Sequence, residues 1–250
     1  MDKIRLIARL DIKAPNLVKG IQLEGLRKLG DPQDFARRYY EDGIDEILYM
    51  DIVASLYGRN SLLDIVRRTT EEVFVPITVG GGLRSIEDVQ KVLAAGADKV
   101  AVNTAAIRDK SILRRVSQRF GSQCMVLSIE AKNNSGCWEA YCDNGREHSG
   151  LDVVDWAHEG EALGAGEILL TSVDREGMKK GMDTELIQAV CDAVSIPVIV
   201  SGGCACAAHA VGAARAGASA VAVAGALHYG EATVHSLKQK IVKEGGVVRL

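Results

Sequence analysis

Two carboxylates in this sequence are placed for acid–base chemistry. Asp11 ends the first predicted strand and Glu130 ends the fifth. In a closed barrel of eight strands, the first and fifth strands lie opposite one another, so the two side chains would face each other across the barrel mouth. Such a pair can give and take protons on a substrate held between them. Taken singly, either residue would serve equally well to cap a turn or to pair with a nearby lysine.

Two glycine pairs indicate a second kind of chemistry, the binding of anions. Gly81-Gly82 and Gly202-Gly203 each follow a predicted strand and precede a predicted helix. Backbone N–H groups can approach an anion closely there, and a helix N-terminus favours negative charge. Asn103-Thr104 and Ala224-Gly225 end the next strands and add donors beside each pair. The duplicated set predicts a ligand with a phosphate at each end, whereas the simpler alternative is that the glycines only make tight turns.

The glycine pairs belong to an internal repeat with a constant offset. Pro76 and Pro197 are 121 residues apart, and Glu46-Ile47-Leu48 recurs at the same offset as Glu167-Ile168-Leu169. The offset is close to half of the 250 residues. Strands that alternate with helices demand parallel crossovers. Together with the repeat, this alternation predicts an α/β fold: one (β/α)8 TIM-barrel domain over residues 1–250, with duplicated half-barrels.

Short runs of β-branched and aliphatic residues predict the strands, and amphipathic segments between them predict the helices. We expect strands near Ile4–Asp11, Glu46–Asp51, Ile77–Val79, Lys99–Val102, Met125–Glu130, Glu167–Thr171, Val198–Val200 and Ala220–Val223. We expect helices over Pro32–Asp42, Leu62–Val73, Ser85–Ala94, Lys110–Phe120, Val153–Leu163, Asp183–Val194 and Ala207–Ala216.

Two connections are longer than a barrel requires, and both follow strands, where catalytic loops lie. Lys13–Gly30 contains Lys19 and is interpreted as a mobile lid over an anionic ligand. Lys132–Gly150 is interpreted as a small hairpin. Further polar residues fall at strand ends and would line the mouth: Asp51, Thr171, Asp174, Glu176 and Ser201.

Charged residues also begin four of the strands. Arg5, Glu46, Lys99 and Glu167 would form a ring at the opposite end of the barrel. Features on this face usually serve stability, and the spacing of these residues alone assigns them no chemistry.

Composition excludes several classes of protein. A net charge of −3 and an aromatic content of 4% argue against nucleic-acid binding. The apolar runs are too short to cross a membrane, and the charged N-terminal residues predict that there is no signal peptide. Six cysteines in a chain of this length indicate reduced thiols and a cytoplasmic location. Cys204-Ala205-Cys206 lacks histidine partners at zinc-like spacing, so we expect no metal. The sequence contains no Walker-type nucleotide loop and no G-x-G-x-x-G in a strand–helix context.

From Ile4 to Leu250 the sequence resembles the cyclase subunits of imidazole glycerol phosphate synthase, the HisF family. The matching signatures include Val18–Gly20, Gly30–Pro32, Asp51–Ser55, Thr78–Gly82, Phe120–Cys124, Glu167–Ser172 and Ser201–Gly203. The resemblance implies a duplicated half-barrel, no cofactor and a substrate with two phosphates. It also implies that a glutaminase subunit docks on the N-terminal barrel face and supplies ammonia to a ribulosyl aminoimidazole carboxamide substrate. The products would be imidazole glycerol phosphate and an aminoimidazole carboxamide ribotide.

Individual residues acquire expected roles from this resemblance. Asp11 and Glu130 match the catalytic positions, and Lys19 matches a lid residue that contacts substrate. Gly82, Asn103 and Thr104 match one phosphate site, and Gly177, Gly203 and Ala224 match the other. Thr171 and Ser201 are expected to bind substrate from their positions at strand ends, and Gly225 is expected at the second phosphate site although it departs from the family. Arg5, Glu46, Lys99 and Glu167 match a gate for ammonia, and Asp98 matches a position that contacts the partner.

Two departures from the family bear on the mechanism. Glu130 stands where the family has Asp, and Arg9 stands where it typically has a small Cys. Because strand side chains alternate, Arg9 should share the inward face with Arg5 and Asp11. Asp11 and Glu130 are its expected partners, and Arg9 could also obstruct the ammonia route. Two alternatives therefore stand beside the histidine-pathway cyclase. One is a paralogue that supplies ammonia to another phosphorylated or nucleotide-sugar substrate of surface polysaccharide synthesis, and the other is a non-catalytic phosphate-binding barrel.

Overall fold

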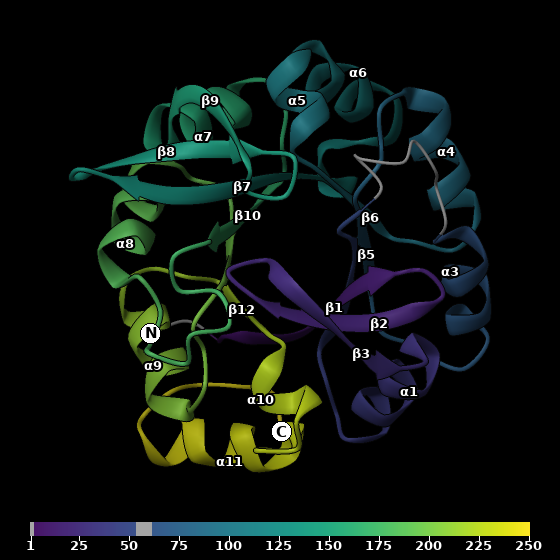
Figure 1. Ribbon diagram of the computed structural model, residues 1–250, viewed down its shortest axis with the longest axis vertical. Coiled ribbons are helices and arrows are strands. Elements are labelled where there is room, and N and C mark those ends of the chain that lie inside the picture. Colours follow the sequence, from purple (N-terminus) through teal and green to yellow (C-terminus); the bar gives the residue numbers. More distant parts are fainter. Residues whose placement is uncertain (1–2, 54–61) are drawn as a thin grey trace.

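Parallel strands close into a barrel in the computed structural model, which describes residues 3–53 and 62–250 (Figure 1). Hydrogen bonds between the first and last barrel strands close the ring, with Arg5 in register with Ala220. In order around the barrel the strands are β1 (Arg5–Lys13), β4 (Glu46–Asp51), β5 (Ile77–Gly80), β6 (Lys99–Val102), β7 (Met125–Asn134), β10 (Glu167–Ser172), β11 (Val198–Ser201) and β12 (Ala220–Val223). The predicted TIM barrel is confirmed.

Helices follow the strands and cover the outside of the barrel (Figure 1). They are α1 (Pro32–Glu41), α3 (Leu63–Thr70), α4 (Ile86–Ala94), α5 (Thr104–Arg108), α6 (Ser111–Phe120), the 3₁₀ turn η1 (Ser122–Cys124), α7 (Val153–Ala162), α8 (Thr184–Ala193), α9 (Ala207–Arg215), α10 (Gly225–His228) and α11 (Val234–Lys243). Local sequence explains several helix starts. For example, Asp31 caps α1 by accepting a hydrogen bond from the backbone N–H of Gln33, and Pro32 occupies the first turn. No helix of the described residues is long and apolar enough to cross a membrane.

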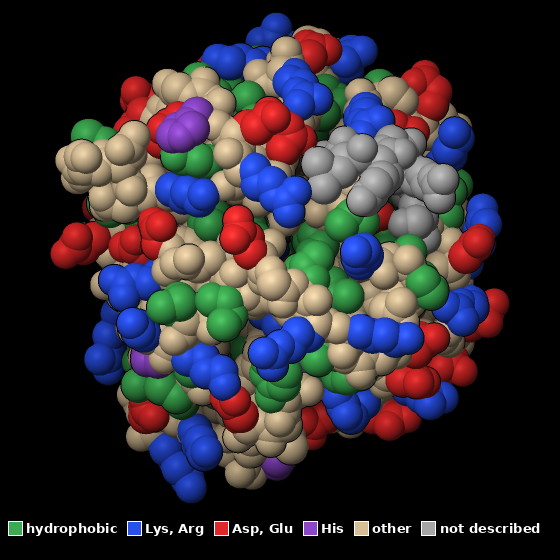
Figure 2. Space-filling view, viewed as in Figure 1, with side chains coloured by type: hydrophobic (Ala, Val, Ile, Leu, Met, Phe, Trp, Pro, Cys, Tyr) green, Lys and Arg blue, Asp and Glu red, His purple; other side chains and the backbone are tan. Residues whose placement is uncertain are grey.

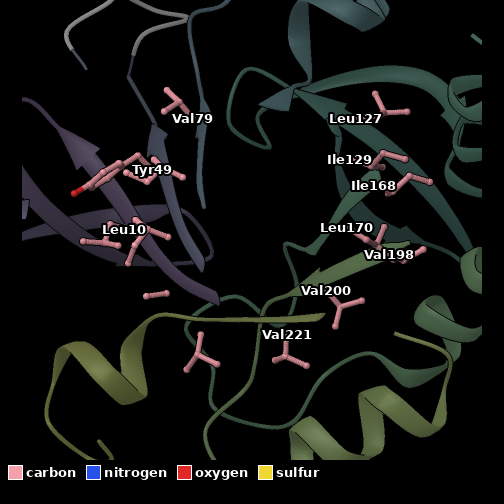
Figure 3. Packing of buried hydrophobic residues seen from close by; sticks show 14 of the residues in the cluster. Leu10, Tyr49, Val79, Leu127, Ile129, Ile168, Leu170, Val198, Val200 and Val221 are labelled. Atoms are coloured by element: carbon pink, nitrogen blue, oxygen red, sulfur yellow. The ribbon is translucent and has the colours of Figure 1, made fainter. Parts of the chain in front are cut away.

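The two faces of each barrel strand bury different side chains. On β1, Leu6, Ala8 and Leu10 point outward into the large cluster between strands and helices, and Figure 3 shows members of this cluster around the ring of strands. Ile7 belongs instead to the smaller cluster inside the barrel. Arg9 and Asp11 share the register of Ile7, so the strand period of two places both of them inside the barrel.

The internal repeat is visible in backbone geometry. Gly81 and Gly202 both have positive φ angles, 93° and 102°. A Cβ at Gly81 would lie 2.1 Å from the carbonyl oxygen of Asp51, and a Cβ at Gly202 would lie 2.5 Å from that of Ser172. Each glycine therefore lets its loop pack on the end of the preceding barrel strand, and the two contacts are related by the repeat.

Both long connections contain β-hairpins. The expected lid forms β2 (Asn16–Ile21) and β3 (Glu24–Gly30), and β2 pairs antiparallel with the extended end of β1. The second connection forms β8 (Cys137–Cys142) and β9 (Glu147–Asp152), which continue from β7. The predicted second hairpin is confirmed. The predicted ends of the first and fifth strands at Asp11 and Glu130 are wrong, because hairpin pairing extends β1 to Lys13 and β7 to Asn134.

The remaining differences lie at helix ends, at short helices and at the C-terminus. The predicted helices do not include α5, α10 and α11, and α11 packs against α9 at the end of the chain. Glycines that follow helices adopt positive φ angles, as at Gly43, Gly96, Gly164 and Gly217. Of the sequence signatures, the Ala54-Ser55 part lies outside the described residues.

We predict that Gly81→Ala destabilises the barrel far more than Gly43→Ala. Both glycines have positive φ angles, but nothing lies within 4 Å of a Cβ at Gly43. Strain alone costs about 1–2 kcal/mol, and the clash with Asp51 adds about 1–3 kcal/mol. At roughly 2–4 °C per kcal/mol, thermal unfolding should show Tm lowered by about 10 °C for Gly81→Ala and about 4 °C for Gly43→Ala. Equal losses would contradict the close packing of this loop.

Candidate active site

A buried arginine crosses the interior of the barrel. The side chain of Arg9 is 2% exposed and comes from β1. Its Nε donates to Oδ1 of Asp11 at 2.9 Å, and its Nη1 donates to Oγ1 of Thr171 at 3.0 Å and to Oγ of Ser201 at 3.1 Å. Thr171 and Ser201 lie on β10 and β11, so the guanidinium links three strands. The predicted inward position of Arg9 and its pairing with Asp11 are confirmed.

Asp11 is held between two cations. Besides Arg9, the Nζ of Lys19 donates to Oδ2 of Asp11 at 3.3 Å, and Lys19 also pairs with Glu176. Burial by itself would raise the pKa of Asp11, but the charges of Arg9 and Lys19 outweigh it and hold the pKa below its usual value. Asp11 is therefore a carboxylate at neutral pH. Lys19 is fixed on β2, so the first hairpin brings this cation over the barrel mouth.

Glu130 occupies a different environment on β7. Its Oε2 accepts a hydrogen bond of 2.7 Å from the backbone N–H of Gly145. Within the described part of the chain it has no ion pair, although it was expected to pair with Arg9. Burial raises the pKa of Glu130 to about 7, against the opposing effects of the Arg9 charge and the Gly145 hydrogen bond. Glu130 can therefore change its protonation state near neutral pH.

His228 fixes the backbone beneath Arg9. Its Nε2 lies 3.0 Å from the carbonyl oxygen of Arg9, and its Nδ1 lies 2.6 Å from the hydroxyl of Tyr39. A carbonyl can only accept, so Nε2 carries the proton and Nδ1 accepts from Tyr39. Burial lowers the pKa of His228 to about 4, which keeps the ring neutral. His228 is a structural link between α10, β1 and α1.

The first glycine pair borders a pocket that reaches Glu130. Gly81, Gly82, Asn103 and Thr104 line it together with Glu130. The hydroxyl of Thr104 accepts from the backbone N–H of Asp143 at 3.0 Å and keeps its own proton for a ligand. The side-chain amide of Asn103 donates to the backbone carbonyl of Tyr141, so one of its two N–H groups is already used within the protein. The first predicted phosphate set is thus brought together in space.

The second glycine pair borders a separate pocket beneath the first hairpin. The residues expected there lie together: Lys19, Gly177, Ser201, Gly203, Ala224 and Gly225 all line it. Thr171 does not line either pocket and contacts Arg9 instead. Ala224 has backbone angles of −124° and −80°, close to the −119° and −86° of Asn103, so the repeat preserves the backbone at both sites.

Sequence reasoning missed the basic side chains around these pockets. Arg84 and Arg108 line the first pocket, and Arg27 and Lys179 line the second. Figure 2 shows basic side chains, interspersed with acidic ones, on the face that carries the barrel mouth. Arg84 is two residues beyond Gly82, so proximity to a glycine pair was the available signal. Arg27 and Lys179 reach the second pocket only because the hairpin and a loop fold over it.

The charged ring lies at the opposite end of the barrel, as predicted. Arg5 pairs with Glu46 and Glu167. Lys99 pairs with the same two carboxylates, at 3.3 Å and 2.8 Å. These four residues alternate in charge and close one end of the interior.

One further group of possible metal ligands exists among the described residues. Cys142, Asp143 and Glu147 have ligand atoms within 4.8 Å of one another. Arg108 lies 2.7 Å from Asp143 and 3.8 Å from Glu147, so a guanidinium already pairs with both carboxylates.

The Cys204-Ala205-Cys206 motif is a separate case. Burial raises the pKa of the Cys204 thiol to about 12, which disfavours the thiolate that a metal would need.

Comparisons with known proteins decide the family. A family model described as "Histidine biosynthesis protein" matches residues 5–233. The chain is 61% identical over 204 residues to the imidazole glycerol phosphate synthase subunit HisF of Legionella pneumophila, a match that covers 81% of this chain and 96% of that one. It is 48% identical to the HisF subunits of Pyrococcus furiosus, covering 98% of both chains, and of Myxococcus xanthus, covering 97% and 96%.

The chain belongs to the HisF family. The resemblance inferred from the sequence is confirmed, as is the assignment to a cyclase of histidine biosynthesis. These relatives do not favour the polysaccharide paralogue or the non-catalytic barrel.

We predict that Glu130→Gln stabilises the protein increasingly as pH rises. An unfolded glutamate ionises near 4.5, whereas the pKa of folded Glu130 is about 7, so the buried carboxylate costs stability that develops between these pH values. Gln avoids this cost and can still accept the hydrogen bond of Gly145. Tm should be close to that of the wild type near pH 4.5 and several degrees higher at pH 8, since the cost is on the order of 3 kcal/mol. The exposed control Glu71→Gln should show no such trend. A pH-independent difference would contradict the shifted pKa.

Proposed function

We propose that the chain adds ammonia to a ribulosyl aminoimidazole carboxamide substrate with two phosphates. It then closes and cleaves the adduct to give imidazole glycerol phosphate and an aminoimidazole carboxamide ribotide. The printed name of its relatives, imidazole glycerol phosphate synthase subunit, supports the product. The observation that carries the proposal is the placement of two glycine-lined pockets on either side of a buried carboxylate pair.

The two pockets suit the two ends of such a substrate. The first offers backbone donors at Gly82 and the hydroxyl of Thr104, and the second offers the backbone around Gly203 and Gly225. Each pocket also contains basic side chains, which neutralise phosphate charge. A ligand bound at both ends would extend across the mouth between Asp11 and Glu130. This geometry favours a two-ended anion over a ligand with a single phosphate.

The carboxylate pair supplies groups that can exchange protons with the substrate or hold its charge. Addition of an amine to a carbonyl, loss of water and cleavage each require proton transfer, which a positioned side chain accelerates by about 10²–10⁴-fold. Asp11 and Glu130 come from opposite strands of the ring, so they can act on two sides of one substrate. Lys19 covers Asp11 from the first hairpin and pairs with both Asp11 and Glu176. We propose that Lys19 gives up one of these two ion pairs and contacts the substrate when substrate binds.

We propose that a glutaminase subunit docks on the N-terminal face of the barrel. The ring of Arg5, Glu46, Lys99 and Glu167 lies at this face and is the proposed gate for ammonia. Phe74, in the connection that leads into β5, is 73% exposed there. Exposed aromatic residues of this kind commonly anchor protein interfaces.

We predict that ammonium salt alone supports turnover of the ribulosyl substrate. Asp11→Asn and Glu130→Gln should each lower kcat by about 10²–10⁴-fold, because each removes a group that exchanges protons or holds charge. The control Glu244→Gln, at the exposed C-terminus of α11, should retain wild-type turnover. The measurement of turnover is the amount of ribotide released over time. Absence of product at high ammonium, with a folded protein, would refute the proposed reaction.

A second prediction tests the docking face. Phe74→Asp should raise the Kd for the glutaminase subunit by tenfold or more, equivalent to about 1.4 kcal/mol. It should abolish glutamine-driven turnover while ammonium-driven turnover persists. The control Ile21→Asp changes another exposed apolar residue, 61% exposed at the end of β2 on the opposite face. Because Ile21 lines the second pocket, this control is compared for glutaminase binding alone. Docking elsewhere would be shown by unchanged binding of Phe74→Asp and weakened binding of Ile21→Asp.

A further inference from the structure

Arg9 makes a hydrogen bond to only one of the two carboxylates of the site. It donates directly to Asp11 and to hydroxyls on β10 and β11, but not to Glu130. The carbonyl of Arg9 is also fixed by His228. Thus both the backbone and the guanidinium of Arg9 are held in place, and the hydrogen-bonding preference for Asp11 is built into the barrel rather than into a mobile loop.

The charges around each carboxylate reinforce this difference. Asp11 faces the cations Arg9 and Lys19, with Glu176 and the neutral His228 beyond them. Glu130 faces the Gly145 N–H and the Arg9 charge, but also three further acidic or thiol groups: Asp11, Asp143 and Cys142. Asp51 lines the same pocket as Glu130. Around Asp11 the direct contacts are cationic, whereas around Glu130 the repulsive neighbours and burial oppose ionisation.

We propose that Arg9 is a positioning residue that holds Asp11 as a permanent carboxylate and leaves Glu130 as the only member of the pair that exchanges protons. This inference rests on the proposed function for its place in the reaction. Asp11 would stabilise positive charge on the substrate nitrogen and stay ionised throughout. Glu130 would accept a proton as a carboxylate and return it as a carboxylic acid, so that its protonation state is restored after each turnover.

The first test needs no turnover. Carboxyl ¹³C NMR of the wild-type protein should show one buried carboxyl that titrates near pH 7, and this signal should be missing in Glu130→Gln. The Asp11 signal, assigned with Asp11→Asn, should stay ionised down to the pH of acid unfolding. The proposal is overturned if Asp11 titrates above pH 5, or if the neutral-pH titration survives in Glu130→Gln.

The second test compares Arg9→Met with Arg9→Lys in ammonium-driven turnover. Removing the charge raises the pKa of both carboxyls, because the guanidinium lowers each of them. The acidic limb of kcat/KM in Arg9→Met should therefore move to higher pH by about one unit, with kcat reduced at least tenfold. Arg9→Lys retains the charge and should keep the limb near its wild-type position. Circular dichroism melting establishes that both variants are folded.

The outcomes separate the two proposals. If Arg9→Met lowers the rate without moving the pH profile, Arg9 has only a structural role and the inference fails. If wild-type protein gives no product, the proposed reaction fails, while the NMR titration still decides whether Arg9 fixes Asp11 as a carboxylate. If Arg9→Met does not fold, the Asp11 titration is measured in Lys19→Met, in which Arg9 is the remaining ion-pair partner of Asp11. An Asp11 that stays ionised there supports the inference, and an Asp11 that titrates above pH 5 overturns it.

Discussion

The buried ion pair between Arg9 and Asp11 constrains the whole interior of the barrel. A guanidinium and a carboxylate removed from water are each costly, and only mutual pairing with further hydrogen bonds offsets that cost. Here the additional partners are hydroxyls on β10 and β11, so the pair ties three strands of the ring together in one arrangement. Breaking such a pair by removing one partner typically costs about 3–5 kcal/mol. The same pair decides which carboxylate is free to exchange protons.

The duplicated halves keep the backbone and diverge in side chains. Gly81 and Gly202 make related contacts because a Cβ would collide with the neighbouring strand end in either half. Side chains are not bound by that steric requirement. Ser85 caps α4 by accepting from the N–H of Asp88, whereas Cys206 at the related position makes no capping bond. The first pocket adjoins Glu130 and the second adjoins Lys19, so a symmetric scaffold presents two different ends to one ligand.

The two end faces of the barrel carry different groups of residues. The C-terminal mouth holds the pockets and carboxylates, and the N-terminal face holds the ring of alternating charges. Between them lie the apolar inner cluster and then Arg9. A small molecule that moves along the barrel axis toward the site would meet the guanidinium of Arg9. In this chain, delivery of ammonia through the barrel would therefore depend on the space that Arg9 leaves.

The sequence by itself determined the barrel, its repeat and most of the site. The alternation of strands and helices and the constant offset leave few other folds, and the strand period of two already placed Arg9 and Asp11 on one inward face. Only the tertiary structure decided that Arg9 bonds to Asp11 and not to Glu130, since both partners were compatible with the pattern. It also decided the hairpin that brings Lys19 over Asp11 and the basic residues around the pockets. The physical reason is that periodicity fixes the face a side chain points to, whereas hydrogen bonding and ionisation depend on distances and burial between segments far apart in the chain.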